Sequence, residues 1–121
     1  MTNPKKQLGD YGETLAARYL ENKGYIIIDV NWHCASGELD IIARQHDTIV
    51  FVEVKTQNAR RSDNVLSNIT PKKQERLIKS VYEYLDQHGL EDAVWRIDAI
   101  AVRLQKGKTA AIDHVEDALG W

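Results

Sequence analysis

Two short runs of β-branched and apolar residues, separated by a polar pair, constrain the fold of this chain more than any other feature. The runs 37–44 and 48–55 have the composition of β-strands, and His46 with Asp47 has the composition of a tight turn. Strands joined by so short a turn pair in the antiparallel direction. The sequence therefore predicts a β-hairpin over residues 37–55.

The length of the turn fixes which residues of the hairpin face one another. A two-residue turn places Asp40 opposite Glu53 and Glu38 opposite Lys55. A four-residue loop would keep this register, whereas an odd-length loop or a bulge would shift it. Opposed residues point to the same face with Cβ atoms about 5 Å apart, and residues two apart on one strand share a face. We therefore expect two convergent carboxylates beside an ammonium group, and convergent carboxylates are what a hard divalent cation requires.

A second interpretation is that Glu53 and Lys55 are solvated residues at a sheet edge. The rest of the strand argues against it, because apolar residues occupy both faces, as is typical of a covered, central strand. These residues are Ile49 and Phe51 on one face and Val50, Val52 and Val54 on the other. Charges at the end of such a strand are costly unless they are paired, bound to metal or placed at a cleft. We favour the functional interpretation.

The composition is that of a globular protein of one domain, residues 1–121. Of the 121 residues 43% are hydrophobic and 28% charged, which is enough for a core without disulfides or structural metals. No apolar run approaches the roughly 18 residues of a membrane span, and the first residues lack the apolar segment of a secretory signal. Cys34 is the single cysteine, so no internal disulfide can form. We expect a cytoplasmic protein with no membrane partner.

Positive charge is concentrated in one segment, although the net charge is −2. Residues 55–79 contain seven basic and two acidic side chains. Charge segregated in this way steers a phosphate backbone to one face of a mildly acidic protein. A solvated helix face and loop would have the same composition, but this segment directly follows the predicted carboxylate pair. That position favours a nucleic-acid surface.

Hydrophobic periodicity and turn residues predict the remaining elements. Before the hairpin we expect a helix over 6–23, a strand over 25–30 and a connection over 31–36. After it we expect a mobile polar loop over 56–69, a helix begun by Thr70 and Pro71 and ended by Gly89, strands over 94–104 and 110–115, and a tail over 116–121. The order helix, three strands, helix, two strands indicates an α/β fold in three layers, with a central mixed β-sheet flanked by helices.

Three further expectations concern packing. The helix over 6–23 is indicated by apolar and aromatic residues that recur at helical spacing, namely Leu8, Tyr11, Leu15, Tyr19 and Leu20. We expect Asp98 to be structural and to pair with Arg96, which lies on the same strand face. The four histidines lack the spacing of zinc ligands, and we interpret them as surface or boundary residues.

Two acidic residues and a lysine on adjacent strands match metal-assisted hydrolysis of a phosphodiester. Mg²⁺ binds to one or two protein carboxylates and keeps sites for waters and phosphate oxygens, so it is the expected cofactor, with Mn²⁺ as the alternative. The metal would stabilise charge on the phosphate and lower the pKa of a bound water. The lysine would orient that water.

These residues resemble a known catalytic hairpin. Segments 37–43 and 50–55, Gly-Glu-Leu-Asp-Ile-Ile-Ala and Val-Phe-Val-Glu-Val-Lys, resemble the PD-(D/E)xK nuclease superfamily, which has a restriction-endonuclease-like fold. The chain most closely resembles the YraN-like family of predicted bacterial nucleases, related to archaeal Holliday-junction resolvases. The resemblance covers nearly the whole chain, including Gly12-Glu13, Lys73 with Tyr84-Leu85, and segment 96–102.

The resemblance implies roles for individual residues. It implies a metal site at Asp40 and Glu53, with Lys55 positioning the attacking water. It adds Glu13 to the catalytic and metal-binding set, although from the residues alone Glu13 is equally a solvated helix residue. Glu38 shares a face with Asp40, and we expect it to support the site or to pair with Lys55.

Four basic residues are expected to contact nucleic acid. Lys73 and Lys72 lie near the start of the second helix, where free N–H groups favour an anion. Arg60 and Arg61 lie in the polar loop. Gln57 departs from the family pattern, which commonly has arginine soon after the lysine, and Arg60 or Arg61 would compensate for it.

Two functions of different classes follow. The first is a metal-dependent endonuclease that hydrolyses phosphodiester bonds in structured or branched DNA. The alternative is a non-catalytic nucleic-acid-binding module that retains the nuclease fold. The intact set of Asp40, Glu53 and Lys55 favours the enzyme, because a pure binder gains nothing from acids where phosphate must approach. Symmetric cleavage of a junction would also require a homodimer.

Overall fold

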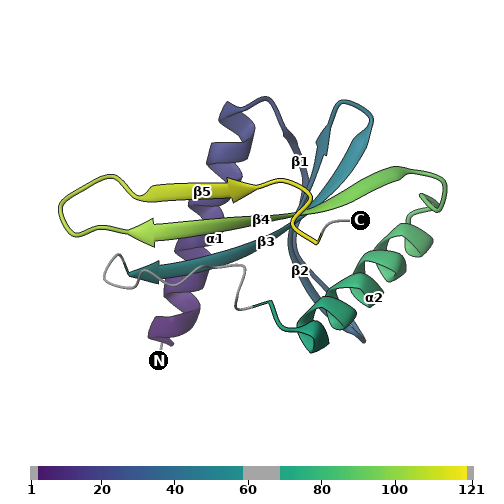
Figure 1. Ribbon diagram of the computed structural model, residues 1–121, viewed down its shortest axis with the longest axis horizontal. Helices are drawn as coiled ribbons and strands as arrows, with labels where there is room; N and C mark the ends of the chain where they lie inside the picture. Colours follow the sequence, from purple (N-terminus) through teal and green to yellow (C-terminus); the bar gives the residue numbers. More distant parts are fainter. Residues whose placement is uncertain (1–2, 59–68, 120–121) are drawn as a thin grey trace.

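The computed structural model describes residues 3–58 and 69–119, which form two helices and five strands (Figure 1). In chain order these are α1 (Pro4–Asn22), β1 (Ile26–Cys34), β2 (Gly37–Gln45), β3 (Thr48–Asn58), α2 (Pro71–Gln87), β4 (Val94–Leu104) and β5 (Ala111–Val115). The predicted order of helices and strands is confirmed. No helix in the described part of the chain is long and apolar enough to cross a membrane.

The five strands form one mixed sheet in the order β1-β2-β3-β4-β5. β1, β2 and β3 form an antiparallel meander, β3 and β4 are parallel, and β5 returns antiparallel to β4 at the edge of the sheet. The parallel pair needs a crossover connection, which contains α2. The predicted mixed sheet is thus confirmed, and β3 of the β2–β3 hairpin is its central strand.

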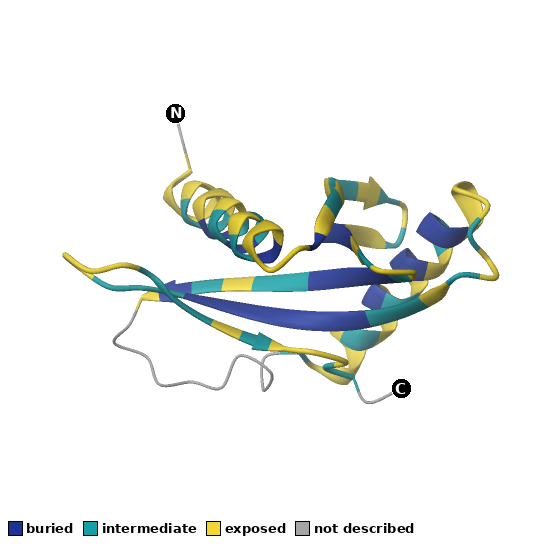
Figure 2. Ribbon diagram, turned by 90° about the horizontal axis from the view of Figure 1, so that it is seen from above, coloured by how far each residue is buried: buried dark blue, intermediate teal, exposed yellow. Residues whose placement is uncertain are grey.

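The helices cover opposite faces of the sheet, which gives the predicted three layers (Figure 2). On one face α1 packs through Ala16 and Leu20 against Val50, Val52 and Ile100. On the other face α2 packs against a second cluster that contains Leu39, Ile42, Phe51 and Ile97, through Leu77, Val81, Tyr84 and Leu85. Residues 49–52 of β3 are buried on both faces, as expected for a covered central strand.

The buried face of α1 consists largely of small residues. Gly12, Ala16 and Leu20 are its buried residues, whereas Tyr11 is 54% exposed. Small residues at Gly12 and Ala16 let the helix axis approach the sheet, and a larger side chain at Gly12 would meet Thr56 of β3. The predicted helix is confirmed, but the spacing of its large side chains does not locate the closest contact with the sheet, because small residues make that contact.

Two strands are longer than predicted. β1 continues through the predicted connection to Cys34, because antiparallel pairing with β2 extends from Ile26↔Arg44 to Cys34↔Gly37. β3 continues to Asn58, because the parallel ladder with β4 extends that far. Residues 56–58 are therefore strand and not loop. The rest of the predicted loop, with Arg60 and Arg61, lies outside the described residues up to position 68.

The start of α2 was predicted correctly. The Thr70 side chain accepts a hydrogen bond from the backbone N–H of Lys73 at 3.2 Å, and Pro71 occupies the first helical position. The helix ends at Gln87, and Gly89 follows with φ of 66°, a conformation that glycine adopts without strain.

Candidate active site

The site forms where β2 separates from β3. The β2–β3 ladder has the predicted register, from Gln45↔Thr48 to Ile41↔Val52, where the pairing ends. β2 remains paired with β1 as far as Gly37, so it follows β1 away from β3. At this point the backbone N–H of Val54 donates to Asp40 Oδ2 at 2.9 Å. A side-chain carboxylate thus accepts from the β3 backbone and is held at the opening between the strands.

Three carboxylates from three elements meet at this opening. Asp40 of β2 is hydrogen-bonded to Glu53 of β3 and to Glu13 of α1. The residue Asp40 is only 8% exposed, and Glu13 and Glu53 are half-buried. The structure thus brings together the three residues that the sequence and its family resemblance assigned to the catalytic and metal-binding set.

The cluster binds protons more tightly than isolated carboxyl groups do. Burial, and then the negative charge of Asp40, raises the pKa of Glu53 to about 8. The same two causes, in the same order, raise the pKa of Glu13 to about 7. Burial also raises the pKa of Asp40, although hydrogen bonds from Val54 N–H, Glu53 and Glu13 oppose the shift. Asp40 therefore acts as the acceptor to which protonated Glu53 and Glu13 donate.

Asn31 contributes to the cluster, although the sequence did not single it out. Its side chain hydrogen-bonds to Glu13, which lowers the pKa of that residue. Asn31 has a φ of 49°, in the left-handed region that asparagine tolerates better than most residues. It was expected in a connection between strands, and its only signal was the residue type.

A cleft of about 580 Å³ lies between Glu53 of the cluster and α2, whereas Glu13 lines a separate hollow beside α1. Glu38, Glu53 and Lys55 line the cleft from the sheet, and Lys73 and Arg76 line it from the helix. The turn between β1 and β2 completes the wall with Cys34, Ala35, Ser36 and Gly37. Acidic and basic side chains thus face the same space, an arrangement that suits an anionic substrate held beside a cation.

Glu38 and Lys55 do not form the pair considered above. Glu38 lies 3.5 Å from His33 Nδ1, and both side chains are largely exposed. Lys55 is exposed and has no salt bridge among the described residues. Glu38 is nevertheless close enough for its charge to raise the pKa of Asp40 and Glu53. It therefore supplements the negative potential of the cluster and leaves the Lys55 ammonium available to a ligand.

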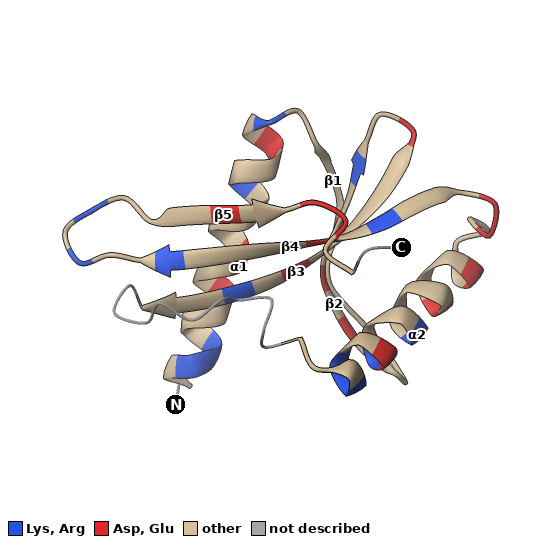
Figure 3. Cartoon of the chain, viewed as in Figure 1, with Lys and Arg blue, Asp and Glu red and all other residues tan. Residues whose placement is uncertain are grey.

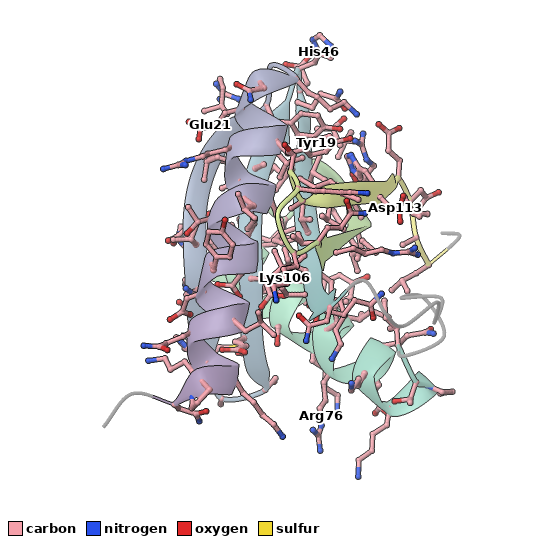
Figure 4. All side chains as sticks on the ribbon, turned by 90° about the vertical axis from the view of Figure 1, so that its left-hand side faces the viewer. Tyr19, Glu21, His46, Arg76, Lys106 and Asp113 are labelled. Atoms are coloured by element: carbon pink, nitrogen blue, oxygen red, sulfur yellow. The ribbon has the colours of Figure 1, made fainter. Side chains whose placement is uncertain are left out.

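The basic residues are placed unequally. Lys73 lies near enough to Glu53 to lower its pKa, but its backbone N–H is engaged by Thr70, so it is the side chain that can meet an anion. Lys72 is exposed and is absent from the cleft lining, whereas Arg76, which the sequence did not single out, belongs to that lining. Figure 4 shows Arg76 near one end of the molecule, opposite His46 of the β2–β3 turn.

The donor atoms suit a hard divalent cation. Three carboxylates offer only oxygen ligands, and a cation would offset both the burial and the repulsion that raise the pKa of Glu13 and Glu53. Within residues 3–58 and 69–119 no three acidic, histidine or cysteine side chains are already disposed to hold a metal ion by themselves. The carboxylates hydrogen-bond to one another instead, so a cation would have to displace protons and complete its shell with water or phosphate.

A second buried polar cluster lies on the α1 face of β4 and β5, and it is structural. Asp98 is fully buried and accepts from Arg96 Nε at 2.9 Å, from the backbone N–H of Asp117 at 3.0 Å, and bonds to His114 Nε2 at 2.8 Å. The expected pairing of Asp98 with Arg96 is confirmed. His114 is less exposed than expected, with 3% of its side chain accessible, because Asp98 and Tyr19 hold it beneath α1.

Comparison with known proteins identifies a family. Residues 12–102 match the model of a family described as "Uncharacterised protein family UPF0102". The chain is 47% identical over 121 residues to a UPF0102 protein of Chloroflexus aurantiacus, an alignment that covers 99% of this chain and 98% of that protein. It is 38% identical to one from Roseiflexus castenholzii, with 98% of each chain covered, and 39% identical to one from Geotalea uraniireducens, with 93% and 89% covered. The matched region contains all three clustered carboxylates and Lys55. The chain belongs to the UPF0102 family.

Proposed function

We propose that this protein is a metal-dependent endonuclease that hydrolyses phosphodiester bonds in structured or branched DNA. The observation that carries the proposal is the convergence of Glu13, Asp40 and Glu53 from three elements. Glu53 and Lys55 of this group line a cleft whose opposite wall is basic. Acids alone would repel a phosphate, so their placement beside a lysine and two helix cations favours a cation-assisted reaction. The preference for branched DNA rests on the resemblance to junction resolvases.

Each residue would have a distinct part in the reaction. Asp40, Glu53 and Glu13 would hold Mg²⁺ or Mn²⁺, which when bound neutralises charge on the scissile phosphate and acidifies water. The hydrogen bond from Val54 N–H fixes one Asp40 oxygen, so this ligand is preorganised. The Lys55 ammonium would orient the attacking water and attract the charge that develops on the phosphate. Lys73 and Arg76 would hold the nucleic-acid backbone across the cleft.

The second candidate is a nucleic-acid-binding module without catalysis. Its support is the basic wall of Lys73 and Arg76, which a binder and an enzyme would share. The two candidates differ in what the acids do, because in a pure binder removing a carboxylate should strengthen the binding of an anion. In the enzyme the same change should abolish cleavage.

The test is cleavage of labelled single-stranded, duplex, flap and four-way DNA with and without Mg²⁺. The wild type should cleave at least one substrate only when the cation is present, and Asp40→Asn should cleave none. Asp47→Asn, at an exposed residue of the β2–β3 turn, is the matched control and should cleave like the wild type. Cleavage that persists in Asp40→Asn, or in the presence of a chelator, would refute the assignment of the site. A protein that binds DNA and never cleaves it would support the second candidate.

A further inference from the structure

Two buried side-chain donors on the same sheet face lack an acceptor. Among the described residues, Gln57 Nε2 and Arg103 Nε are the buried side-chain nitrogens without a hydrogen-bond partner. Gln57 is 9% exposed, so water does not readily replace the missing acceptor. Buried polar groups are satisfied in the great majority of cases, and an orphaned one calls for an explanation. Both orphaned atoms are donors only, so the partner that is missing must be an acceptor.

The two residues are neighbours across the parallel β3–β4 ladder. Gln57 is aligned with Arg103, as Lys55 is with Ala101 and Glu53 with Ala99. Side chains alternate along a strand, so Gln57 lies on the same sheet face as Lys55 and Glu53. Its Cα is two residues, or about 6.6 Å, beyond that of Lys55 along β3. The donor pair therefore continues the line that begins at the carboxylate cluster.

The charge around this pair is positive. Among the described residues Arg103 has one ionic partner, Asp113 of β5, at 3.4 Å from its Nη2, and its side chain is 34% exposed and so can be reached from solvent. Lys106 and Lys108 follow in the turn between β4 and β5, which is blue in Figure 3 at the same end of the sheet as the end of β3. An anion bound here would thus be close to two donors that lack an acceptor and to a lysine-containing turn, with Asp113 as the acidic neighbour of Arg103.

We infer that Gln57 and Arg103 form a phosphate-binding subsite for a nucleic-acid strand, adjacent to the phosphate held at the carboxylate cluster. A phosphodiester offers two unesterified oxygens, so it can accept from the Gln57 amide and from the Arg103 guanidinium together. The spacing of Lys55 and Gln57 along β3 lets neighbouring phosphates of one strand engage the two positions. This inference rests on the proposed nuclease function, because that function supplies the strand.

The subsite can be observed directly by nuclear magnetic resonance without any metal. The Gln57 side-chain amide and the Arg103 Nε–H give separate signals in the ¹⁵N-labelled protein. Titration with inorganic phosphate, and then with the dinucleotide pTpT, should move both signals along saturable curves, with pTpT binding more tightly. Acetate at the same ionic strength tests whether any carboxylate suffices, and it should move them less. Signals that do not respond to phosphate or pTpT would overturn the inference.

Substitutions test the same subsite by affinity. Gln57→Glu has nearly the same shape but replaces the donor by an acid, which can pair with Arg103 and so keep the protein folded. It should weaken the binding of pTpT about tenfold or more, the value of a hydrogen bond to a charged group. Arg103→Gln, at the more exposed residue of the pair, should weaken the binding of pTpT to a similar extent. Arg44→Gln removes an equal charge from an exposed residue beside the β2–β3 turn and should leave the affinity unchanged. Equal effects of Arg44→Gln and Arg103→Gln would show that only net charge matters, and would overturn the subsite.

Failure of the subsite and failure of the proposed function give different results. Cleavage by the wild type with unchanged cleavage by Gln57→Glu and Arg103→Gln would retain the nuclease and overturn the subsite. Binding of pTpT that depends on Gln57 and Arg103, with no cleavage of any substrate, would retain the subsite and refute the nuclease.

Discussion

The packing of α1 against β3 controls the position of Glu13, and Gly12→Ala tests this directly. A Cβ atom at Gly12 would overlap Thr56 Oγ1 and would lie 2.7 Å from Thr56 Cβ and 2.8 Å from Thr56 Cγ2. No rotation of the threonine clears all three atoms, because its Cβ is fixed to the β3 backbone. Ordinary contact requires 3.4–4 Å, so α1 must retreat by about 1 Å.

Two opposing effects set the outcome for stability. Alanine is favoured over glycine inside a helix by about 1 kcal/mol, whereas overpacking a filled interface costs about 1–3 kcal/mol. Gly9→Ala is the matched control, because a Cβ at Gly9 meets nothing within 4 Å and gains only the helix term. Urea denaturation should therefore show Gly12→Ala to be less stable than Gly9→Ala by about 1–3 kcal/mol.

Gly12→Ala should affect the rate of cleavage more strongly than it affects the free energy of unfolding. A displacement of about 1 Å in a catalytic constellation can cost about a hundredfold in rate. Cleavage by Gly12→Ala should fall accordingly, while Gly9→Ala should remain at the wild-type level. Removing the obstacle with Thr56→Gly in the Gly12→Ala background should restore part of the activity. A Gly12→Ala protein as stable and as active as Gly9→Ala would refute the proposed close packing.

Three further predictions address the site chemistry and the core. Lys55→Ala should abolish cleavage but leave Mn²⁺ binding, measured by calorimetry, largely intact. Asp40→Ala should remove both cleavage and Mn²⁺ binding. Cleavage by Lys55→Ala at the wild-type rate would exclude a role for the lysine. The pKa of Glu53 is raised from 4.5 to about 8 in the folded protein, so the stability that its proton supplies is complete below pH 4.5 and is lost as the pH rises through about 8. In the presence of a chelator, the free energy of unfolding should therefore fall between pH 4.5 and about 8, and it should fall less in Glu53→Gln. Mn²⁺ should restore the stability at pH 8. A free energy of unfolding that does not change with pH would contradict the protonation of Glu53 in the folded protein. Asp98→Ala removes the acceptor that the Arg96 Nε–H, the buried His114 side chain and the Asp117 backbone N–H share, and should cost about 3 kcal/mol or more in urea denaturation. Asp113→Ala should cost less than about 1 kcal/mol, because the Asp113 side chain is 60% exposed.

The features predicted correctly from sequence are those set by neighbours along the chain. The β2–β3 register follows from a two-residue turn and the period of two. The ladder ends at Ile41↔Val52, one position short of Asp40 and Glu53, yet the register still predicts that these two side chains approach each other, as they do. The start of α2 follows likewise from Thr70 and Pro71, whose effects act within one helical turn. Such interactions are encoded within a few residues, and a pattern of residue types reveals them.

The features that the tertiary structure decided depend on residues distant in sequence. Residues 56–58 have the composition of a loop, yet they are strand because β4 pairs with them from more than forty positions away. Glu13 could be a solvated helix residue until the contact between Gly12 and Thr56 brings it to Asp40. The alignment of Gln57 with Arg103 has the same origin. The sequence thus determined which groups a hairpin would oppose, whereas only packing between elements determined which further groups join them, because local patterns carry no information on how closely two elements approach.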